Sequence, residues 1–316
     1  MGARAYRLAP RARRGRAILP GMVRAPFAAG RQPPSDRPAP RALRSPARRL
    51  AAWLRRWREG DRPAAWSSAR VARYYDEWHE RYLAAFGDTF QSQRTADLGA
   101  LLAHVADQAE LAPGRRVLDA GCGVAGPALW LARHRGVEVE ALTISPAQAA
   151  EARRRVAAAG LGERVRVTLG DFHRLEAHYP EASFDAVLFL ESLVHSDHPR
   201  RVLAAAHRVL RPGGVLYVKD LFQRARIPDR AERARVRRVI ANVNREFCLN
   251  VKAQRPFLAA LRRAGFDLEW LRAPPLATQH DLGNAFVAAH AIDIYEGPPV
   301  TFLDWLELKA RRPGRP

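Results

Sequence analysis

Short apolar runs alternate with longer amphipathic segments along residues 115–219. The short runs are typical of strands, whereas the segments between them have the period of helices. The predicted strands are 116–120, 137–142, 164–169, 186–190 and 215–219, and the predicted helices are 127–135, 146–159 and 198–210. Residues 186–190 are apolar throughout, so we expect them at the buried centre of a parallel sheet. The alternation predicts a doubly wound α/β fold.

The pattern beyond residue 219 adds two helices and two strands. The helices are predicted at 229–247 and 254–264, and the strands at 266–271 and 305–310. Together the elements indicate a Rossmann-like, mostly parallel seven-stranded sheet with helical cap elements. We expect this catalytic domain to span residues 113–316, with a helical insertion at about 223–265.

Aromatic side chains mark a predicted helix at 67–86, before the α/β region. They recur at helical spacing and form one face: Tyr74, Tyr75, Trp78, Tyr82 and Phe86. Such a face belongs either to the core or to a lid over a substrate. A second helix is predicted at 94–109, so residues 63–112 are interpreted as an N-terminal helical lid or substrate cap.

Residues 1–62 differ from the rest in composition. They contain 17 arginines and three acids, a net charge of +14 out of +21 for the whole chain. The segment is rich in Pro and Ala and has no periodicity, which predicts a disordered leader that is dispensable for turnover. An organelle transit peptide and a true start at Met22 are alternatives. A basic tail that binds nucleic acid is a further alternative, but no RNA- or DNA-reading module is recognisable elsewhere and we expect no nucleic-acid partner.

The remaining composition narrows the class of protein. Arginine outnumbers lysine 50 to three, a bias that indicates GC-rich coding rather than selection for a binding surface. Two cysteines, Cys122 and Cys248, cannot build a disulfide framework. No apolar run reaches the ~18–20 residues of a membrane span. We expect a cytoplasmic protein without a transmembrane segment, and the oligomeric state stays open.

The most specific motif is the glycine turn after the first α/β strand, in Val117–Gly126. Gly121 and Gly123 let a ligand approach the backbone, and an acid, Asp119, stands two residues before the first glycine. The arrangement resembles motif I of the class I S-adenosylmethionine-dependent methyltransferases. The resemblance implies that Asp119, Gly121, Cys122 and Gly123 bind the cofactor, S-adenosyl-L-methionine.

A second motif follows the next strand, where Thr143, Ser145 and Gln148 are spaced as Thr-x-Ser-x-x-Gln. It resembles the branch that contains cyclopropane fatty-acid synthases, tocopherol and sterol methyltransferases, and geranyl diphosphate C-methyltransferases. By that resemblance Thr143, Ile144 and Gln148 contact the ribose and adenine. A plain helix N-cap by Ser145 before Pro146 is compatible with this role.

Two further strand ends complete the resemblance, which covers about 71–316. After the third strand, Asp171 and Phe172 are implied to bind the adenine, with His173 at the rim. After the fourth, Glu191, Ser192 and His195 are implied to lie beside the sulfonium, with Glu191 also contacting the cofactor. The family often carries a His-x-Gly-Trp-like stretch before motif I. Residues 90–94 read Phe-Gln-Ser-Gln-Arg instead, which leaves the acceptor open.

The candidate chemistry is transfer of a methyl group to a small molecule. Methylating an alkene leaves a carbocation, which Glu191 and aromatic faces can stabilise. We therefore expect C-methylation of an isoprenoid-like or unsaturated acceptor, with N- or O-methylation of a natural product as the alternative. The candidate substrate-binding residues are Tyr74, Tyr75, Trp78, Tyr82, Phe222 and Phe247.

Three points remain open on the sequence alone. Glu191 either acts at the reacting centre, with Ser192 or His195 as a relay, or only forms hydrogen bonds to the backbone or to His195. The asparagines of 240–250 either line the substrate or form a solvated helix edge. Histidine and cysteine lack metal-ligand spacing, so no metal is expected.

Overall fold

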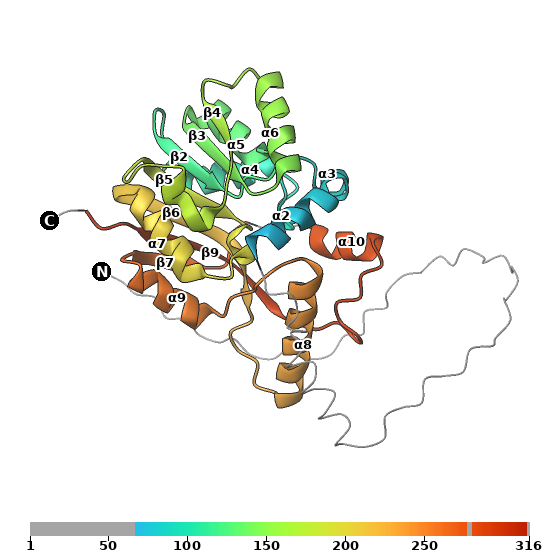
Figure 1. The fold of residues 1–316 in the computed structure, drawn as a ribbon. Helices are drawn as coiled ribbons and strands as arrows, with labels where there is room; N and C mark the ends of the chain where they lie inside the picture. The colour runs from blue at the N-terminus through green and yellow to red at the C-terminus, as the bar shows by residue number, and fades with distance from the viewer. Residues whose placement is uncertain (1–66, 277–279, 315–316) are drawn as a thin grey trace, which may run out of the picture. The chain divides into compact units, whose positions relative to one another are not determined.

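The computed structural model describes residues 67–276 and 280–314 (Figure 1). Its seven-stranded sheet has the order β4-β3-β2-β5-β6-β9-β7. The pairs from β4 to β6 are parallel, and β9 runs antiparallel to both β6 and β7. The strands are β2 Arg116–Ala120, β3 Glu138–Thr143, β4 Val165–Leu169, β5 Phe184–Leu190, β6 Leu210–Gln223, β7 Asp267–Arg272 and β9 Leu303–Arg311. The predicted fold class is confirmed.

Helices cover both faces of this sheet. On one face lie α4 (Leu98–Gln108), α5 (Gly126–Arg135) and α6 (Pro146–Ala158), and on the other lie α7 (Pro199–Val209) and α9 (Gln254–Arg263). Successive residues of β5 point into opposite layers, Val187 towards α7 and α9 and Leu188 towards α4 to α6. Because both layers are apolar, the strand has no polar face, as its sequence indicated.

The N-terminal helices differ from their prediction. The segment 67–86 forms two helices, α2 (Ser68–Glu77) and α3 (His79–Phe86), because Trp78 leaves helical geometry with φ −101° and ψ 5°. Helix α4 starts at Leu98 rather than 94, where Asp97 caps it by accepting a hydrogen bond from the Ala100 amide. Residues 93–94 instead form strand β1, which pairs with β8 (His280–Asp281).

Several other elements shape the edge at the carboxyl ends of the strands. Helix α8 (Arg230–Glu246) lies in the predicted insertion, and strand β6 runs on to Gln223 because β9 pairs with it over that length. The short 3₁₀ turns η1 (Phe172–Ala177) and η2 (Leu193–His195) and helix α10 (Leu282–Ala289) had no clear signal in the sequence. In Figure 1, α10 lies beside α3.

Two further predictions concern the leader and membrane-spanning helices. The predicted leader, 1–62, lies outside the described residues. Among residues 67–276 and 280–314, no helix is both long and apolar enough to cross a membrane.

Candidate active site

A small cavity of about 60 Å³ lies where β2, β3, β4 and β5 end. Open α/β sheets bind ligands at this edge. Its walls come from α2, the segment before β1 and the loops after the four strands. The lining residues are Ser68, Val71, Tyr75, Phe90, Gly121, Gly123, Leu142, Thr143, Ile144, Gln148, Gly170, Asp171, Phe172, His173, Leu190, Glu191, Ser192 and His195.

The glycine turn forms the floor of this cavity. Gly121 has φ +101°, and a Cβ there would lie 2.4 Å from the Cβ of Ser192. Gly123 has φ +55°, and a Cβ there would lie 3.3 Å from the ring of Phe90. Both positions therefore require glycine, because the backbone is in the left-handed region and neighbouring side chains approach closely.

Asp119, at the end of β2, is a buried acid without full hydrogen bonding. Its Oδ2 has no hydrogen-bond partner among the described residues, and burial raises its pKa to about 7. A buried acceptor of this kind is costly unless a donor satisfies it. Cys122, another predicted cofactor contact, does not line the cavity; its thiol is buried in the core and its amide bonds to the Leu142 carbonyl.

The Thr-x-Ser-x-x-Gln motif places Thr143, Ile144 and Gln148 in the cavity wall. The hydroxyl of Thr143 donates to Oε1 of Gln148 at 2.7 Å, while Ser145 caps α6 by accepting from the Gln148 amide. The capping and lining roles therefore coexist. Asp76, on α2, accepts from the Ser145 hydroxyl at 2.5 Å and fastens α2 to the start of α6.

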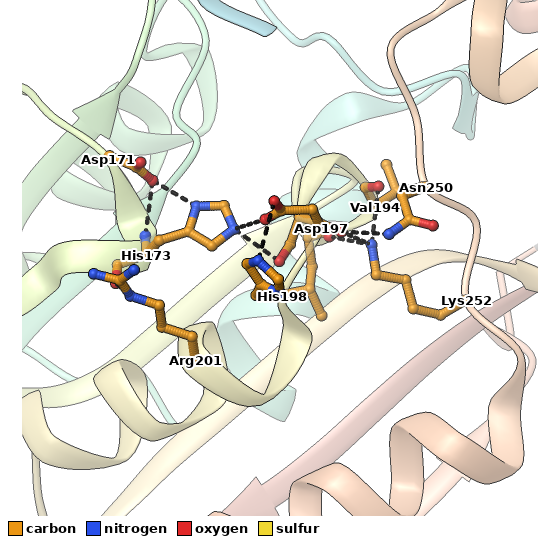
Figure 2. A network of polar contacts seen from close by, with 10 residues as sticks. Asp171, His173, Val194, Asp197, His198, Arg201, Asn250 and Lys252 are labelled. Carbon is orange, nitrogen blue, oxygen red and sulfur yellow. Dashed lines mark hydrogen bonds and ion pairs between the residues drawn. The ribbon is translucent and has the colours of Figure 1, made fainter. Parts of the chain in front are cut away.

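Asp171 joins this cavity to a polar network shown in Figure 2. His173 donates to Asp171 from its amide and through Nδ1 at 2.6 Å, and its Nε2 lies 2.9 Å from the Ser196 hydroxyl and 3.2 Å from Asp197. Lys252 donates to the Ser196 carbonyl. The network thus links the end of β4 to the turn that follows η2.

This network determines the burial of His173 and the charge of Asp171. His173 is only 5% exposed, so its predicted place at the rim is wrong. Burial alone would raise the pKa of Asp171, but hydrogen bonds from His173 and Ser68 lower it to about 2. Asp171 is therefore a carboxylate near neutral pH and can accept further hydrogen bonds.

A second, larger cavity of about 460 Å³ adjoins the first. Its walls are mostly apolar and aromatic. They include Tyr75, Tyr82, Phe86, Phe90, Ser92, Glu191, Val194, His195, Leu221, Val243, Phe247, Leu249, Phe286, Val287, Ile294, Tyr295, Val300, Phe302, Leu303 and Trp305. Four residues line both cavities, and we call them the junction residues: Tyr75, Phe90, Glu191 and His195.

His195 is held in one orientation at the junction. Its Nδ1 lies 3.0 Å from the Cys248 carbonyl, which can only accept, so Nδ1 carries the proton. Its Nε2 then accepts from the Tyr75 hydroxyl at 2.8 Å. Burial lowers the pKa of His195 to about 4. The imidazole is therefore neutral at pH 7.

The Glu191 carboxylate accepts hydrogen bonds from the backbone, as one of the two sequence interpretations had it, and also from side chains that the sequence did not suggest. Its Oε2 accepts from the amide and hydroxyl of Ser92 at 2.7 and 2.9 Å, and its Oε1 lies 2.5 Å from Nζ of Lys219. His195 is not among the partners recorded for this carboxylate. Ser192 donates its hydroxyl to the Ala120 carbonyl and packs over Gly121. Lys219 was missed, although a lone lysine in an apolar strand was a usable signal.

The predicted substrate residues divide into two groups. Tyr75, Tyr82 and Phe247 line the larger cavity. Tyr74 and Trp78 stack on each other at 5.8 Å behind that wall and do not line either cavity.

Phe222 also lies away from both cavities. It packs against Phe257 in the core, with ring centres 5.2 Å apart. Asn242 is buried and donates to the Ile294 carbonyl, so the interpretation of a solvated helix edge is wrong there. Phe90, Phe286 and the walls from 294–305 were not anticipated, since long-range contacts bring them in. No cluster of metal-ligating side chains occurs in the part of the chain that the structure describes.

Comparisons with known proteins agree with this architecture. The model of a family described as a methyltransferase domain matches residues 118–218. Methyltransferase GfsG of Streptomyces halstedii is 35% identical over 172 residues, which cover 51% of this chain and 61% of that protein. The 24-methylenesterol C-methyltransferase 2 of Oryza sativa subsp. japonica is 41% identical over 114 residues, 36% of this chain and 31% of that protein.

A solved structure covers more of the chain. The [4+2]-cyclase SpnF superposes with a TM-score of 0.64 and 26% identity, covering 79% of this chain and 97% of that one. The chain spans less than two thirds of the two curated relatives named above. The family match covers the glycine turn, the strand ends of the small cavity and strands β2 to β5, which are the parts that carry the motifs. Residues 118–218 therefore carry a methyltransferase domain, and the chain resembles the class I S-adenosylmethionine-dependent methyltransferases in fold and motifs.

Proposed function

We propose that the protein transfers a methyl group from S-adenosyl-L-methionine, bound in the small cavity, to a small apolar molecule in the large cavity. The observation that carries this proposal is the contact of the two cavities along the four junction residues. Methyl transfer requires donor and acceptor to meet in line with water excluded. A shared wall of buried side chains supplies such a meeting point.

The small cavity fits the cofactor chemically. Asp119 offers an unsatisfied buried carboxyl oxygen, and Gly121 and Gly123 form a cradle that a Cβ would fill. Asp119, Gly121 and Gly123 would hold one end of the cofactor, with the backbone of Cys122 beneath them. Thr143, Ile144 and Gln148 would lie along the ribose and adenine, and Asp171 and Phe172 along the adenine. When bound, the cofactor supplies a methyl group activated by a sulfonium.

Cofactor entry requires movement of the cap. The small cavity measures about 60 Å³, well below the ~300 Å³ at the lower end of small-molecule sites. Helix α2 and Phe90 are the walls that do not belong to the sheet or its loops. We therefore propose that the described part of the predicted cap, residues 67–112, acts as a lid, and that helix α2 swings away when the hydrogen bonds of Asp76 with Ser145 and Ala147 break.

The favoured reaction is C-methylation of an isoprenoid-like or unsaturated acceptor. Aromatic faces stabilise a cation formed on such an acceptor, and the junction and adjoining walls carry Tyr75, Phe90 and Trp305. A relative named as a sterol C-methyltransferase supports this choice. Glu191 lies at the same junction, with Ser192 and His195 beside it, but its carboxylate is balanced by Lys219, so the aromatic faces would carry most of the stabilisation.

O-methylation is the second candidate, and His195 favours it. A neutral imidazole whose Nε2 is an acceptor can take the proton of a hydroxyl nucleophile. The Tyr75 hydroxyl occupies that nitrogen in this structure, so an acceptor hydroxyl would have to replace it. The pKa of about 4 makes His195 a weak base, which is why carbon remains the favoured acceptor.

The test is a screen with S-adenosylmethionine carrying an isotope-labelled methyl group. Unsaturated isoprenoids, hydroxylated polyketides and amines are supplied in turn, and products are identified by mass spectrometry. We expect label on carbon in an apolar product, with one S-adenosylhomocysteine formed per turnover. Conversion of an acceptor without S-adenosylhomocysteine formation would contradict methyl transfer and favour a reaction like that for which SpnF is named.

A further inference from the structure

The Glu191–Lys219 ion pair lies beside the junction, where Glu191 directly follows β5 and Lys219 stands within the neighbouring strand β6. Both side chains are almost fully buried, with exposed fractions of 5% and 3%. Glu191 directly follows β5 and has a backbone φ of +57°, which is uncommon for a residue with a side chain. The hydrogen bonds and the ion pair of its carboxylate stabilise this backbone conformation.

Apart from the ring of Trp305, which lies 5.9 Å from the Lys219 ammonium, the side-chain hydrogen-bond partners of this pair come from one segment. Lys219 donates to Glu191, to the Gln91 side chain at 3.0 Å and to the Gln93 carbonyl at 2.6 Å. Glu191 accepts from the amide and hydroxyl of Ser92. The pair is therefore a clamp on residues 88–94, which we call the junction segment.

The junction segment also touches the glycine turn. The ring of Phe90 lies over Gly123, and the carbonyl of Asp88 lies where a Cβ on Gly126 would stand, 2.1 Å away. Phe90 lines both cavities. A shift of this segment would therefore alter the opening between the cavities and the space above the glycine turn together.

We propose that Lys219 is a positioning residue for methyl transfer: with Glu191 it holds the junction segment so that Phe90 sets the opening between cofactor and acceptor. This role rests on the proposed function. Lys219 lines neither cavity itself and acts through Glu191, which lines both. The ammonium also neutralises Glu191, so the pair adds little net charge to the reacting centre.

Charge-removal variants separate positioning from chemistry. Lys219→Met leaves the Glu191 carboxylate buried without its counter-charge, which is the costly half of a broken pair. Glu191→Gln combined with Lys219→Met removes both charges and keeps an acceptor for Ser92. Lys309→Met is the matched control. Lys309 lies on β9, forms ion pairs with Glu110 and Glu269, and lines neither cavity.

The measurements are kcat, KM for the acceptor, and hydrogen–deuterium exchange of peptides covering the junction segment. We expect Lys219→Met to lower kcat at least about tenfold and to speed exchange of 88–94 by a similar factor. The double variant should recover most of the lost kcat. Lys309→Met should change neither quantity by more than about twofold.

A different pattern would overturn the proposal. If the Glu191 charge itself acts in chemistry, Glu191→Gln and the double variant both lose about 10²-fold in kcat while exchange of 88–94 stays at the wild-type rate. If Lys219→Met does not fold, Ser92→Ala replaces it, with faster exchange of 88–94 expected and an unchanged rate contradicting the clamp. Exchange is measured without turnover. Failure of the wild-type protein to bind S-adenosylhomocysteine would therefore overturn the proposed function and leave the test of the clamp intact.

Discussion

The two cavities are built in contrasting ways. The small cavity is lined mainly by turns that follow consecutive strands, so that most of its wall comes from residues 121–195. The large cavity takes its walls from α2 and α3, the junction segment, α8 and residues 283–305. The first is encoded by short motifs, the second by contacts between segments far apart in the chain. The small cavity is thus constrained locally, whereas the large cavity can change with any of several loops.

The largest effect is expected from a variant that fills the space above the glycine turn in the small cavity and leaves the large cavity unchanged. Gly121→Val places a branched side chain at φ +101° and within contact of Ser192. We expect S-adenosylhomocysteine binding to weaken at least about 100-fold. Isothermal titration measures it.

A matched control separates strain from lost space. Gly160→Val imposes a side chain at φ +65° where nothing lies within 4 Å. It should lower the melting temperature and leave binding within about threefold. Equal loss of binding in both variants would mean that global destabilisation, not the cradle, explains the Gly121 result.

His195 tests the boundary between the two cavities, because it lines both of them. Burial lowers its pKa from the ordinary 6.5 to about 4, so the unfolded chain takes up a proton first as the pH falls. The stability due to the neutral, buried imidazole is thus present above pH 6.5 and is lost progressively towards pH 4. From pH 7 to 5 we expect wild type to lose about 2 kcal/mol relative to His195→Gln.

Urea unfolding of both proteins at each pH gives this difference. Other buried acids contribute equally to both proteins, so comparing the two isolates His195. An identical pH dependence in the two proteins would show that His195 is not held neutral in the folded state.

The acceptor side is tested by Phe286, which lines the large cavity and packs against Tyr82 with ring centres 5.0 Å apart. Phe286→Ala removes apolar wall from the large cavity and none from the small one. We expect the acceptor KM to rise about tenfold, while the affinity for S-adenosylhomocysteine changes less than about twofold. Steady-state kinetics and titration measure the two, and a matching loss in both would show that the cavities are not independent.

The smallest effect is expected from removing residues 1–62. Their composition cannot bury a core, so a chain that starts at Pro63 should fold and turn over at the wild-type rate. Gel filtration, circular dichroism and the labelled-methyl assay check this. A folded but inactive truncation would show that the segment contributes to the acceptor side.

The sequence predicted the sheet and several residues that line the small cavity, because both depend on local patterns. Strand Arg116–Ala120 was predicted at its observed bounds, and Thr143, Gln148 and Asp171 lie in one cavity wall as their motifs suggested. Asp119 and Cys122, both from the glycine-turn motif, do not line this cavity, and the Cys122 side chain packs in the core.

The acceptor side was predicted poorly, for a physical reason. Helical periodicity places Tyr74, Tyr75 and Trp78 on one face, but only Tyr75 of the three lines the cavities, and the helix is interrupted at Trp78. The partner of Glu191 is one strand away in space, although Lys219 lies 28 residues further along the chain. Neither fact follows from the spacing of residues in the sequence.

The central claim is that the edge formed by the ends of β2 to β5 binds the methyl donor. Isothermal titration of the wild-type protein with S-adenosylhomocysteine tests it most directly. The account predicts one site per chain with a micromolar Kd, weakened by Gly121→Val and unaffected by Phe286→Ala. Absence of binding at millimolar concentrations, or binding that Gly121→Val leaves intact, would contradict it.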